Sequence, residues 1–425
     1  MSNYVIIGAS AAGIHAAEEI RTRETDAVIT MLSDEPFLPY RRYRLADMLS
    51  GKARERELIY RGADFFTQQR IEVMKPCKAE RVNPDKKYVQ LDNKNRLNYD
   101  CLIIASGVRT VLPREIKGTQ RFGVAGFRTL GVVKDIQDLI PISHLACVWG
   151  SGVAGVQAAA AFKARGLDVR IVEPQEQLLK DIVSAEAAGF IAERLSSKGI
   201  EIIIGQNIVE LMGNGDVKAV RLSKGKVIGC GIVAVDMFYN AQADFLSETA
   251  VAVGPEGIVA DEFLCASVPT IFCAGDAALA KDAVTGNALA GRAWAVAVEQ
   301  GTLAGRNAVL QAQGRASERQ KYPGIISAQR FNCLDMTILA VGRRSVEANG
   351  NCEMLVSQEP GAYYRNIIVQ GNRLVGYTCA GASAPEAEPI VRLIREQVDI
   401  SALKDRLLAG DVTLPEPAGQ MSSPL

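Results

Sequence analysis

Histidine is scarce in this chain, with only His15 and His144 among 425 residues, so no histidine is available for acid/base chemistry in its C-terminal part. Neither sign of charge is in excess, since Lys and Arg total 48 and Asp and Glu also total 48. A neutral chain has no general attraction to nucleic acid or to a membrane surface, and we expect neither partner. The sequence has no charge-free apolar run of about 18 residues and no room for a signal peptide before its first apolar run, so we expect a cytoplasmic protein.

Cysteine is present, but not in the patterns of a metal site. The nine cysteines are an odd number, no two are spaced Cys-x-x-Cys, and most lie within apolar runs. These features disfavour an iron–sulfur cluster or a structural zinc held by this chain, and we expect no metal. We therefore predict reduced cysteines in the hydrophobic core, at positions 77, 101, 147, 230, 265, 273, 333, 352 and 379.

Short Val, Ile and Leu runs alternate with Ala-rich segments along most of the chain. The runs at residues 27–32, 99–104, 145–149 and 169–173 predict strands, and the Ala-rich segments predict helices. This order is typical of β-α-β units, so we expect an α/β fold with parallel sheets. With 425 residues and 48% hydrophobic residues, the chain is long enough for two or three hydrophobic cores.

Two Gly-rich turns carry most of the functional information. Gly8-Ala-Ser10-Ala-Ala-Gly13 follows the apolar residues 4–7, and Gly150-Ser-Gly152-Val-Ala-Gly155 follows residues 145–149. Each pattern predicts a strand that turns sharply into a helix, whose first amides and positive dipole end hold a pyrophosphate. Two such turns indicate two dinucleotides, and therefore an oxidoreductase that brings two redox cofactors together.

The residue that follows the second turn at the usual distance is acidic. Glu173 lies 23 residues after Gly150, where a carboxylate accepts hydrogen bonds from both ribose hydroxyls of a nucleotide. A carboxylate also repels a 2′-phosphate, and Pro174-Gln175-Glu176-Gln177 supplies no arginine to bind one. We therefore expect NADH to be preferred over NADPH.

Two further motifs make the pattern specific. Leu102-Ile-Ile-Ala-Ser106-Gly107 and Thr270-Ile-Phe-Cys-Ala-Gly275-Asp276 fall where the FAD/NAD-dependent pyridine-nucleotide oxidoreductases have a crossover turn and a second flavin motif. With the two Gly-rich turns, the chain resembles this family over residues 1–405. The resemblance implies two Rossmann-like nucleotide-binding domains, for FAD and for NAD, followed by a C-terminal α+β domain.

The resemblance also implies domain boundaries. Alternating strands near residues 365–369 and 373–377, with a turn between them and a helix over 386–398, indicate the α+β domain. The end of the chain has a disordered composition. We predict an FAD-binding domain in two parts, an NAD-binding domain, a C-terminal interface domain and a flexible tail, at residues 1–110 and 242–320, 111–241, 321–408, and 409–425.

By the same resemblance, individual residues are assigned to the two cofactors. Asp276 would bind a ribityl hydroxyl, although it could instead be a helix cap, and Trp294 would lie beside the isoalloxazine ring, although it could be a core aromatic. The full FAD set is Gly8, Ser10, Ala11, Ala12, Gly13, Glu35, Arg42, Ala79, Ser106, Gly107, Gly275, Asp276 and Trp294. The NAD set is Gly150, Gly152, Val153, Ala154, Gly155 and Glu173.

A segment after the second predicted strand is similar to one branch of the family. Pro39-Tyr40-Arg41-Arg42 resembles the Pro-Tyr-x-Arg segment of rubredoxin and ferredoxin reductases, in which Arg42 would neutralise FAD phosphate. This branch includes flavoproteins of nitrite reductases and of carbon monoxide dehydrogenase systems. Arg41 and Arg44 could be solvated or could face an acidic carrier. The chain departs from the branch at Ala46-Asp47, where a Ser-Lys pair is common, and residues 235–244 lack the usual Gly-x-x-Pro-Asn pattern.

The disulfide-reducing branches of the family are disfavoured. They need a cysteine soon after the first β-α-β unit, whereas the first cysteine here is Cys77, and they use a C-terminal histidine that is absent. We expect no catalytic side chain with an acid/base role. The resemblance implies FAD-dependent transfer of electrons between NAD(H) and a separate one-electron iron–sulfur carrier such as a rubredoxin or ferredoxin. An NADH oxidase and a flavin-bound redox-responsive binding protein are the alternatives, and a homodimer is compatible with the sequence.

Overall fold

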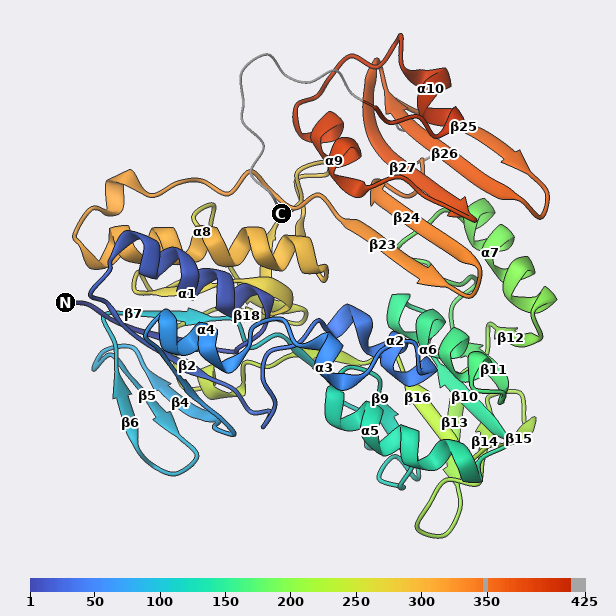
Figure 1. The fold of residues 1–425 in the computed structure, drawn as a ribbon, viewed down its shortest axis with the longest axis horizontal. Helices are drawn as coiled ribbons and strands as arrows, with labels where there is room; N and C mark the ends of the chain where they lie inside the picture. Colours follow the sequence, from blue (N-terminus) through green and yellow to red (C-terminus); the bar gives the residue numbers. More distant parts are fainter. Residues whose placement is uncertain (347–350, 414–425) are drawn as a thin grey trace.

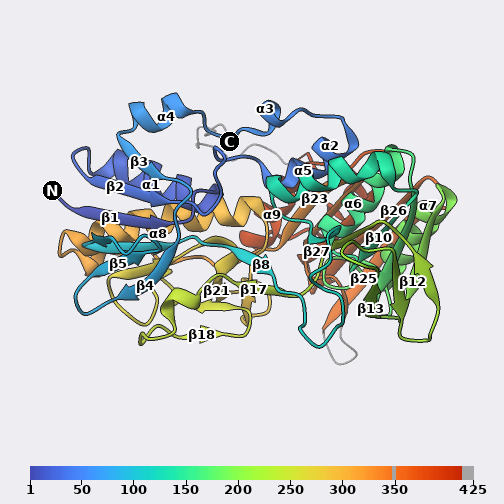
Figure 2. The same ribbon diagram turned by 90° about the horizontal axis from the view of Figure 1, so that it is seen from below.

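The computed structural model describes residues 1–346 and 351–413. Its first parallel sheet has the strand order β20-β7-β1-β2-β3, so a strand from late in the sequence completes a sheet begun at the N-terminus (Figures 1 and 2). The apolar runs predicted as strands form its centre. The strands are β1 (Asn3–Ile7), β2 (Val28–Leu32), β3 (Ile71–Met74), β7 (Cys101–Ile104) and β20 (Ile271–Cys273).

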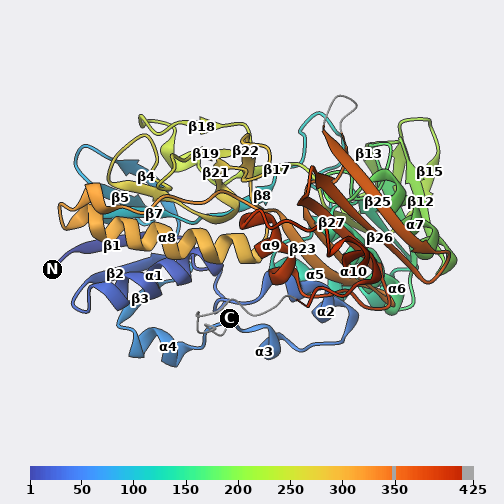
Figure 3. The same ribbon diagram turned by 90° about the horizontal axis from the view of Figure 1, so that it is seen from above.

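Two long helices lie side by side against this sheet, α1 (Ala11–Arg23) and α8 (Trp294–Ala312) (Figures 1 and 3). They approach closely because glycines of α8 face the backbone of α1: a Cβ atom added to Gly301 would lie 2.1 Å from the carbonyl oxygen of Ala12. Small antiparallel sheets accompany this unit. Their strands are β4 (Ala79–Asn83), β5 (Tyr88–Leu91) and β6 (Arg96–Asn98), and β18 (Val253–Gly254), β19 (Gly257–Val259), β21 (Ala278–Lys281) and β22 (Ala288–Ala290), with β19 and β21 paired in parallel.

A second parallel sheet repeats the arrangement in the order β12-β11-β10-β16-β9. Its strands are β9 (Val124–Gly126), β10 (Leu145–Trp149), β11 (Asp168–Glu173), β12 (Ile200–Ile204) and β16 (Ile232–Val235). The helices of this unit are α5 (Leu130–Leu139), α6 (Val153–Ala164) and α7 (Ala185–Ser197). An antiparallel sheet of β13 (Ile208–Met212), β14 (Ala219–Leu222) and β15 (Val227–Gly229) adjoins it.

The chain passes between the two units through a pair of antiparallel strands, β8 (Val108–Thr110) and β17 (Tyr239–Ala241). Three short helices, α2 (Leu45–Ser50), α3 (Glu55–Leu58) and α4 (Ala63–Gln68), follow β2. Short 3₁₀ turns occur at Arg42–Arg44, Ile140–Ile142, Asp244–Leu246, Gly275–Ala277 and Ala316–Glu318.

The C-terminal part is an antiparallel sheet in the order β23-β24-β27-β26-β25. The strands are β23 (Ala328–Cys333), β24 (Met336–Gly342), β25 (Cys352–Glu359), β26 (Tyr363–Gln370) and β27 (Arg373–Gly381), and the helices are α9 (Ala387–Arg395) and α10 (Lys404–Ala409). The predicted helix over 386–398 is shorter than expected, because Gln397 has a positive φ of 52° and ends the helical course.

The predicted α/β class and the C-terminal α+β unit are confirmed. The domain boundaries stay predictions, and most of the predicted tail, residues 414–425, lies outside the described residues. All nine cysteines are free; eight are buried, as predicted for core residues, and Cys352 is half-buried. Within residues 1–346 and 351–413, none of the helices is long and apolar enough to cross a bilayer.

Candidate functional site

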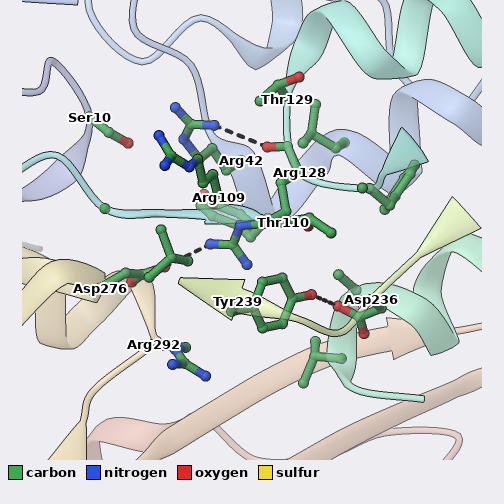
Figure 4. A pocket seen from close by; sticks show the side chains of 18 of the residues that line it. Ser10, Arg42, Arg109, Thr110, Arg128, Thr129, Asp236, Tyr239, Asp276 and Arg292 are labelled. Atoms are coloured by element: carbon green, nitrogen blue, oxygen red, sulfur yellow. Dashed lines mark hydrogen bonds and ion pairs between the residues drawn. The ribbon is translucent and has the colours of Figure 1, made fainter. Parts of the chain in front are cut away.

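A single cavity of about 830 Å³ is lined by both Gly-rich turns. Its lining comes from the ends of β1, β2, β7, β10, β11 and β16, as expected for ligands bound at the carboxyl ends of parallel strands. The volume is in the upper part of the range of ligand pockets. Figure 4 shows several of the charged and polar side chains that line it.

The first turn has the geometry of a pyrophosphate cradle. Gly8 has a φ of +113°, and a Cβ atom there would lie 2.1 Å from the carbonyl oxygen of Ala105. Gly13 lets the helix approach its own turn, because a Cβ atom would lie 1.9 Å from the Gly8 oxygen. Ser10 precedes α1 without a side-chain cap, and the lining continues over Ala11 and Ala12. Amides at the start of α1 therefore lie beside the cavity where an anion would bind.

The second turn repeats this construction with one difference. Gly150 has a φ of +97°, and Gly152, Val153 and Ala154 line the cavity at the uncapped start of α6. The backbone N–H of Gly155 is already used, since it donates to Oδ2 of Asp236 at 2.5 Å. A side chain from the end of β16 thus lies against the helix terminus that is predicted to bind NAD.

Glu173 ends β11 and is buried at the edge of the cavity. Its Oε2 accepts hydrogen bonds from the backbone N–H (2.8 Å) and the hydroxyl (2.6 Å) of Ser151, and its Oε1 accepts one from the backbone N–H of Gln175 (2.8 Å). These three donors fix the carboxylate in place beside the second turn. Oε1 keeps a further lone pair for a ligand hydroxyl, whereas both lone pairs of Oε2 are used by Ser151.

Two of the predicted FAD residues, Glu35 and Arg42, are joined to each other. Glu35 forms an ion pair with Arg42 and accepts a hydrogen bond from the Tyr40 hydroxyl at 2.7 Å. Arg42 also donates to the carbonyl oxygen of Arg128 at 3.0 Å. Both Glu35 and Arg42 line the cavity, so either group could turn towards a bound nucleotide.

Asp276 lies opposite, at the second flavin motif. Gly275 has a φ of +75°, and its N–H donates to Oε1 of Gln300 in α8 at 2.8 Å. Asp276 pairs with the guanidinium of Arg128 at 2.8 Å (Figure 4), and the 3₁₀ turn that contains it has no side-chain cap. The carboxylate therefore faces the cavity rather than acting as a cap.

The remaining predicted FAD residues differ in their placement. Ser106 and Gly107 line the cavity, and the Ser106 hydroxyl donates to the carbonyl oxygen of Gln242 at 2.7 Å. Ala79 begins β4 and packs against a hydrophobic cluster, whereas the preceding residue, Lys78, lines the cavity. The contact between Ala79 and FAD stays a prediction.

A cluster of three aromatic side chains lies at one side of the cavity. The Trp294 ring meets the ring of Tyr43 edge-on at 5.2 Å and that of Tyr60 at 5.0 Å, measured between centroids. Trp294 and Tyr43 both line the cavity, and Tyr43 is 53% exposed. Ala46, which stands where the branch usually has serine, lines the cavity as well, whereas Asp47, at the lysine position, forms an ion pair with Arg44.

The structure also places residues at the site that the sequence did not reveal. Arg128, after β9, and Arg292, before α8, hold their guanidinium carbons 4.7 Å and 5.5 Å from the centroid of the Tyr239 ring. Thr110 adjoins them across the β8–β17 pair. Arg128 and Arg292 lie in loops, whereas Thr110 and Tyr239 lie in β8 and β17. The sequence contained one signal that could have pointed to this group: Arg128 is a cation that follows a short apolar strand.

Two buried polar atoms in this lining have no partner within the described protein. They are Oγ1 of Thr110 and Nε of Arg292. Since buried polar groups are almost always hydrogen-bonded, both atoms are suited to a ligand that fills the cavity. Together with two glycine cradles that a Cβ atom would obstruct, this lining fits two dinucleotides.

Asp236 is the most perturbed carboxyl of the cavity. Its pKa is raised to about 7, mainly by burial and also by the nearby Glu173 carboxylate, while the Gly155 N–H and the Arg128 guanidinium act in the opposite direction. Its other oxygen accepts a hydrogen bond from the Tyr239 hydroxyl. Within the described residues, neither cysteine nor histidine lines the cavity.

Comparisons with known proteins agree with this geometry. The family model of the pyridine nucleotide-disulphide oxidoreductases matches residues 2–301. The epsilon subunit of NADH-dependent phenylglyoxylate dehydrogenase from Aromatoleum evansii is 23% identical over 97% of this chain and 96% of its own length. Rubredoxin-NAD(+) reductase from Ectopseudomonas oleovorans is 26% identical over 65% of this chain and 72% of its own length.

Solved structures show the same fold. The covalent putidaredoxin reductase–putidaredoxin complex contains a chain with 20% identity and a TM-score of 0.84, with 96% of each chain covered. The water-forming NADH oxidase from Lactobacillus brevis has 19% identity and a TM-score of 0.85, with 95% of this chain and 92% of that chain covered. The chain belongs to the pyridine nucleotide-disulphide oxidoreductase family and is an oxidoreductase that uses FAD and NAD(H).

Proposed function

We propose that this protein is an FAD-dependent NADH oxidoreductase whose partner is a separate one-electron iron–sulfur carrier of the rubredoxin or ferredoxin type. The observation that carries the proposal is one cavity that joins two dinucleotide cradles and reaches the surface beside exposed Tyr43. Relatives named rhodocoxin reductase and rubredoxin-NAD(+) reductase support the choice of partner.

The residues of the chain act mainly by position and charge. Amides at the starts of α1 and α6 hold the two pyrophosphates, and Glu173 receives the ribose hydroxyls of NADH in preference to a 2′-phosphate. Arg42 and Arg128 offset negative charge on the FAD side. When bound, FAD supplies the chemistry, since it accepts hydride from NADH and passes electrons on singly. Binding of FAD and NADH in one cavity sets the distance between them for hydride transfer.

The aromatic residues supply a route to the carrier. Trp294 lies inside the cavity, and Tyr43 extends from it to the solvent. Arg41 lies with its guanidinium carbon 5.3 Å from the centroid of the Tyr60 ring, beside this group. A carrier that docks here with acidic residues would meet positive charge beside the exposed Tyr43.

The test is anaerobic reduction of purified iron–sulfur carriers by NADH and holoenzyme, followed by their visible spectra. We expect at least one rubredoxin or ferredoxin to be reduced with catalytic turnover. Reduction of oxygen alone, with every carrier left oxidised, would favour an NADH oxidase. A long-lived reduced state that changes only the oligomeric state would favour the redox-responsive binding protein.

A second function is favoured by one comparison. The phenylglyoxylate dehydrogenase subunit matches this chain over nearly the full length of both, which is compatible with a flavoprotein subunit that returns electrons to NAD⁺ within a larger enzyme. The same site would serve electron transfer from NADH to the carrier and from the carrier to NAD⁺. Reduction of NAD⁺ by holoenzyme and a pre-reduced carrier would reveal the reverse direction. NADH preference, a homodimer and a cytoplasmic location stay predictions.

A further inference from the structure

The end of β16 places a carboxylic acid directly over the NAD-binding turn. Asp236 immediately follows the last residue of this strand, Val235, in the segment that lacks the Gly-x-x-Pro-Asn pattern. Its side chain is 7% exposed and lines the cavity beside Gly152 and Val153 (Figure 4). A buried carboxyl in this place is not needed for the fold of a Gly-rich turn, whose glycines leave the helix terminus open for a ligand.

The Asp236 carboxyl group fills space at the start of α6 and accepts a hydrogen bond from one of the backbone donors there. Oδ2 of Asp236 accepts the hydrogen bond of the Gly155 N–H at 2.5 Å. The same oxygen would lie 2.7 Å from a Cβ atom on Gly152 and 2.9 Å from one on Gly155, so it is in contact with both glycines of the turn. An internal anion therefore lies where the start of α6 attracts negative charge.

Neighbouring groups hold this carboxyl from several elements. Tyr239 of β17 donates its hydroxyl to Oδ1, and α6 offers the Gly155 amide. Arg128, after β9, supplies positive charge, although its guanidinium is shared with Asp276, and Glu173 at the end of β11 adds negative charge. The Tyr239 ring also lies against the Arg128 guanidinium, so the carboxyl is connected to the FAD side of the cavity.

We propose that Asp236 is a positioning residue for NAD(H), whose ionised carboxylate competes with the dinucleotide pyrophosphate for the start of α6, so that binding of NAD(H) to the ionised form takes up one proton. This rests on the proposed NADH-dependent function. The neutral acid still holds Tyr239 in place, but it does not repel the pyrophosphate. The two negative charges of the incoming ligand therefore favour the protonated side chain.

The affinity for NAD(H) should decrease as the pH rises. Burial raises the pKa of Asp236 to about 7, so the acid is mostly neutral at pH 6 and mostly ionised at pH 8. NAD(H) binds the neutral form, and the apparent dissociation constant is the intrinsic one divided by the neutral fraction. The apparent dissociation constant should thus rise about tenfold between pH 6 and pH 8.

The experiment measures binding of ADP-ribose to the oxidised holoenzyme by calorimetry at pH 6, 7 and 8. ADP-ribose carries the pyrophosphate but no nicotinamide, so it cannot reduce the flavin, and its pyrophosphate does not titrate in this range. Repeating the pH 7 titration in buffers of different ionisation enthalpy gives the number of protons taken up. We expect about half a proton at pH 7, because about half of the free protein is already protonated there.

Asp236→Asn provides the matched test, since amide and acid have the same shape. This variant should bind ADP-ribose with the same affinity at all three pH values and with no proton uptake. Asp168→Asn removes a carboxylate from the exposed start of β11 and should retain the wild-type pH dependence. Flavin content and the thermal midpoint confirm that both variants are folded.

Three results would overturn the proposal. Wild-type binding that is tight but independent of pH, without proton uptake, would refute it even if Asp236→Asn fails to fold, and it would leave the NADH-dependent function intact. Undiminished pH dependence in folded Asp236→Asn would assign the proton to another group. Failure of ADP-ribose to bind at any pH would instead refute the NAD site itself, and the proposal with it.

Discussion

Substitution of Gly301 by Ala tests the close approach of α1 and α8, on which the first cradle depends. The new Cβ atom would lie 2.1 Å from the carbonyl oxygen of Ala12 and 2.7 Å from its Cα atom, both of which are backbone positions. The helices must separate by roughly 1 Å before this contact becomes ordinary. Overpacking of this kind costs about 3 kcal/mol, whereas Ala in place of Gly gains about 1 kcal/mol of helix propensity. We expect a net loss of about 2 kcal/mol in the free energy of unfolding.

Gly189→Ala is the matched control. Gly189 lies on the exposed face of α7, and a Cβ atom there meets nothing within 4 Å. The same substitution should therefore stabilise the protein by about 1 kcal/mol.

Urea unfolding, followed by circular dichroism and by release of flavin fluorescence, separates the two variants. Because Ala12 lines the cavity, Gly301→Ala should also release FAD at a lower urea concentration than wild type. If both variants are stabilised equally and retain flavin equally, the close approach of the two helices is wrong.

The remaining predictions concern the two cofactor sites. Asp276→Ala should retain less FAD after gel filtration than wild type, because Arg128 loses its partner and the ligand loses an acceptor; unchanged retention would refute a cofactor role for Asp276. Wild-type protein should favour NADH over NADPH by about 1–3 kcal/mol in anaerobic flavin reduction, the scale of a charge-assisted hydrogen bond. Glu173→Ala should lose most of this preference, and equal efficiencies in the wild type would show that Glu173 does not discriminate.

The local chemistry of the cradles was predictable from sequence. Glycine at positions 8 and 150 marks turns with positive φ after apolar strands, and the strands and helices around them follow from short-range patterns. Glu173 could be placed for the same reason, because its distance from the turn is set by one β-α-β unit. The FAD and NAD assignment came from resemblance, and the family match supports it.

The middle of the cavity was not predictable in this way. Arg128 and Arg292 lie in separate loops, and both meet Tyr239 of β17, which pairs with β8 between the two sheets. Sequence spacing carries no information about such long-range contacts. Residues 235–244 were recognised only as a departure from the family pattern. That Asp236 fills this gap, and accepts a bond from Gly155, required the structure.

We infer that this cavity joins NADH to one flavin, and that this flavin is the sole redox centre. An anaerobic titration of the FAD-loaded protein with NADH, followed by the flavin absorbance, tests it most directly. Because only the two-electron flavin couple is present, full bleaching should need about one NADH per FAD. A reproducible requirement for two NADH per FAD would reveal a second redox centre in the chain and contradict the account.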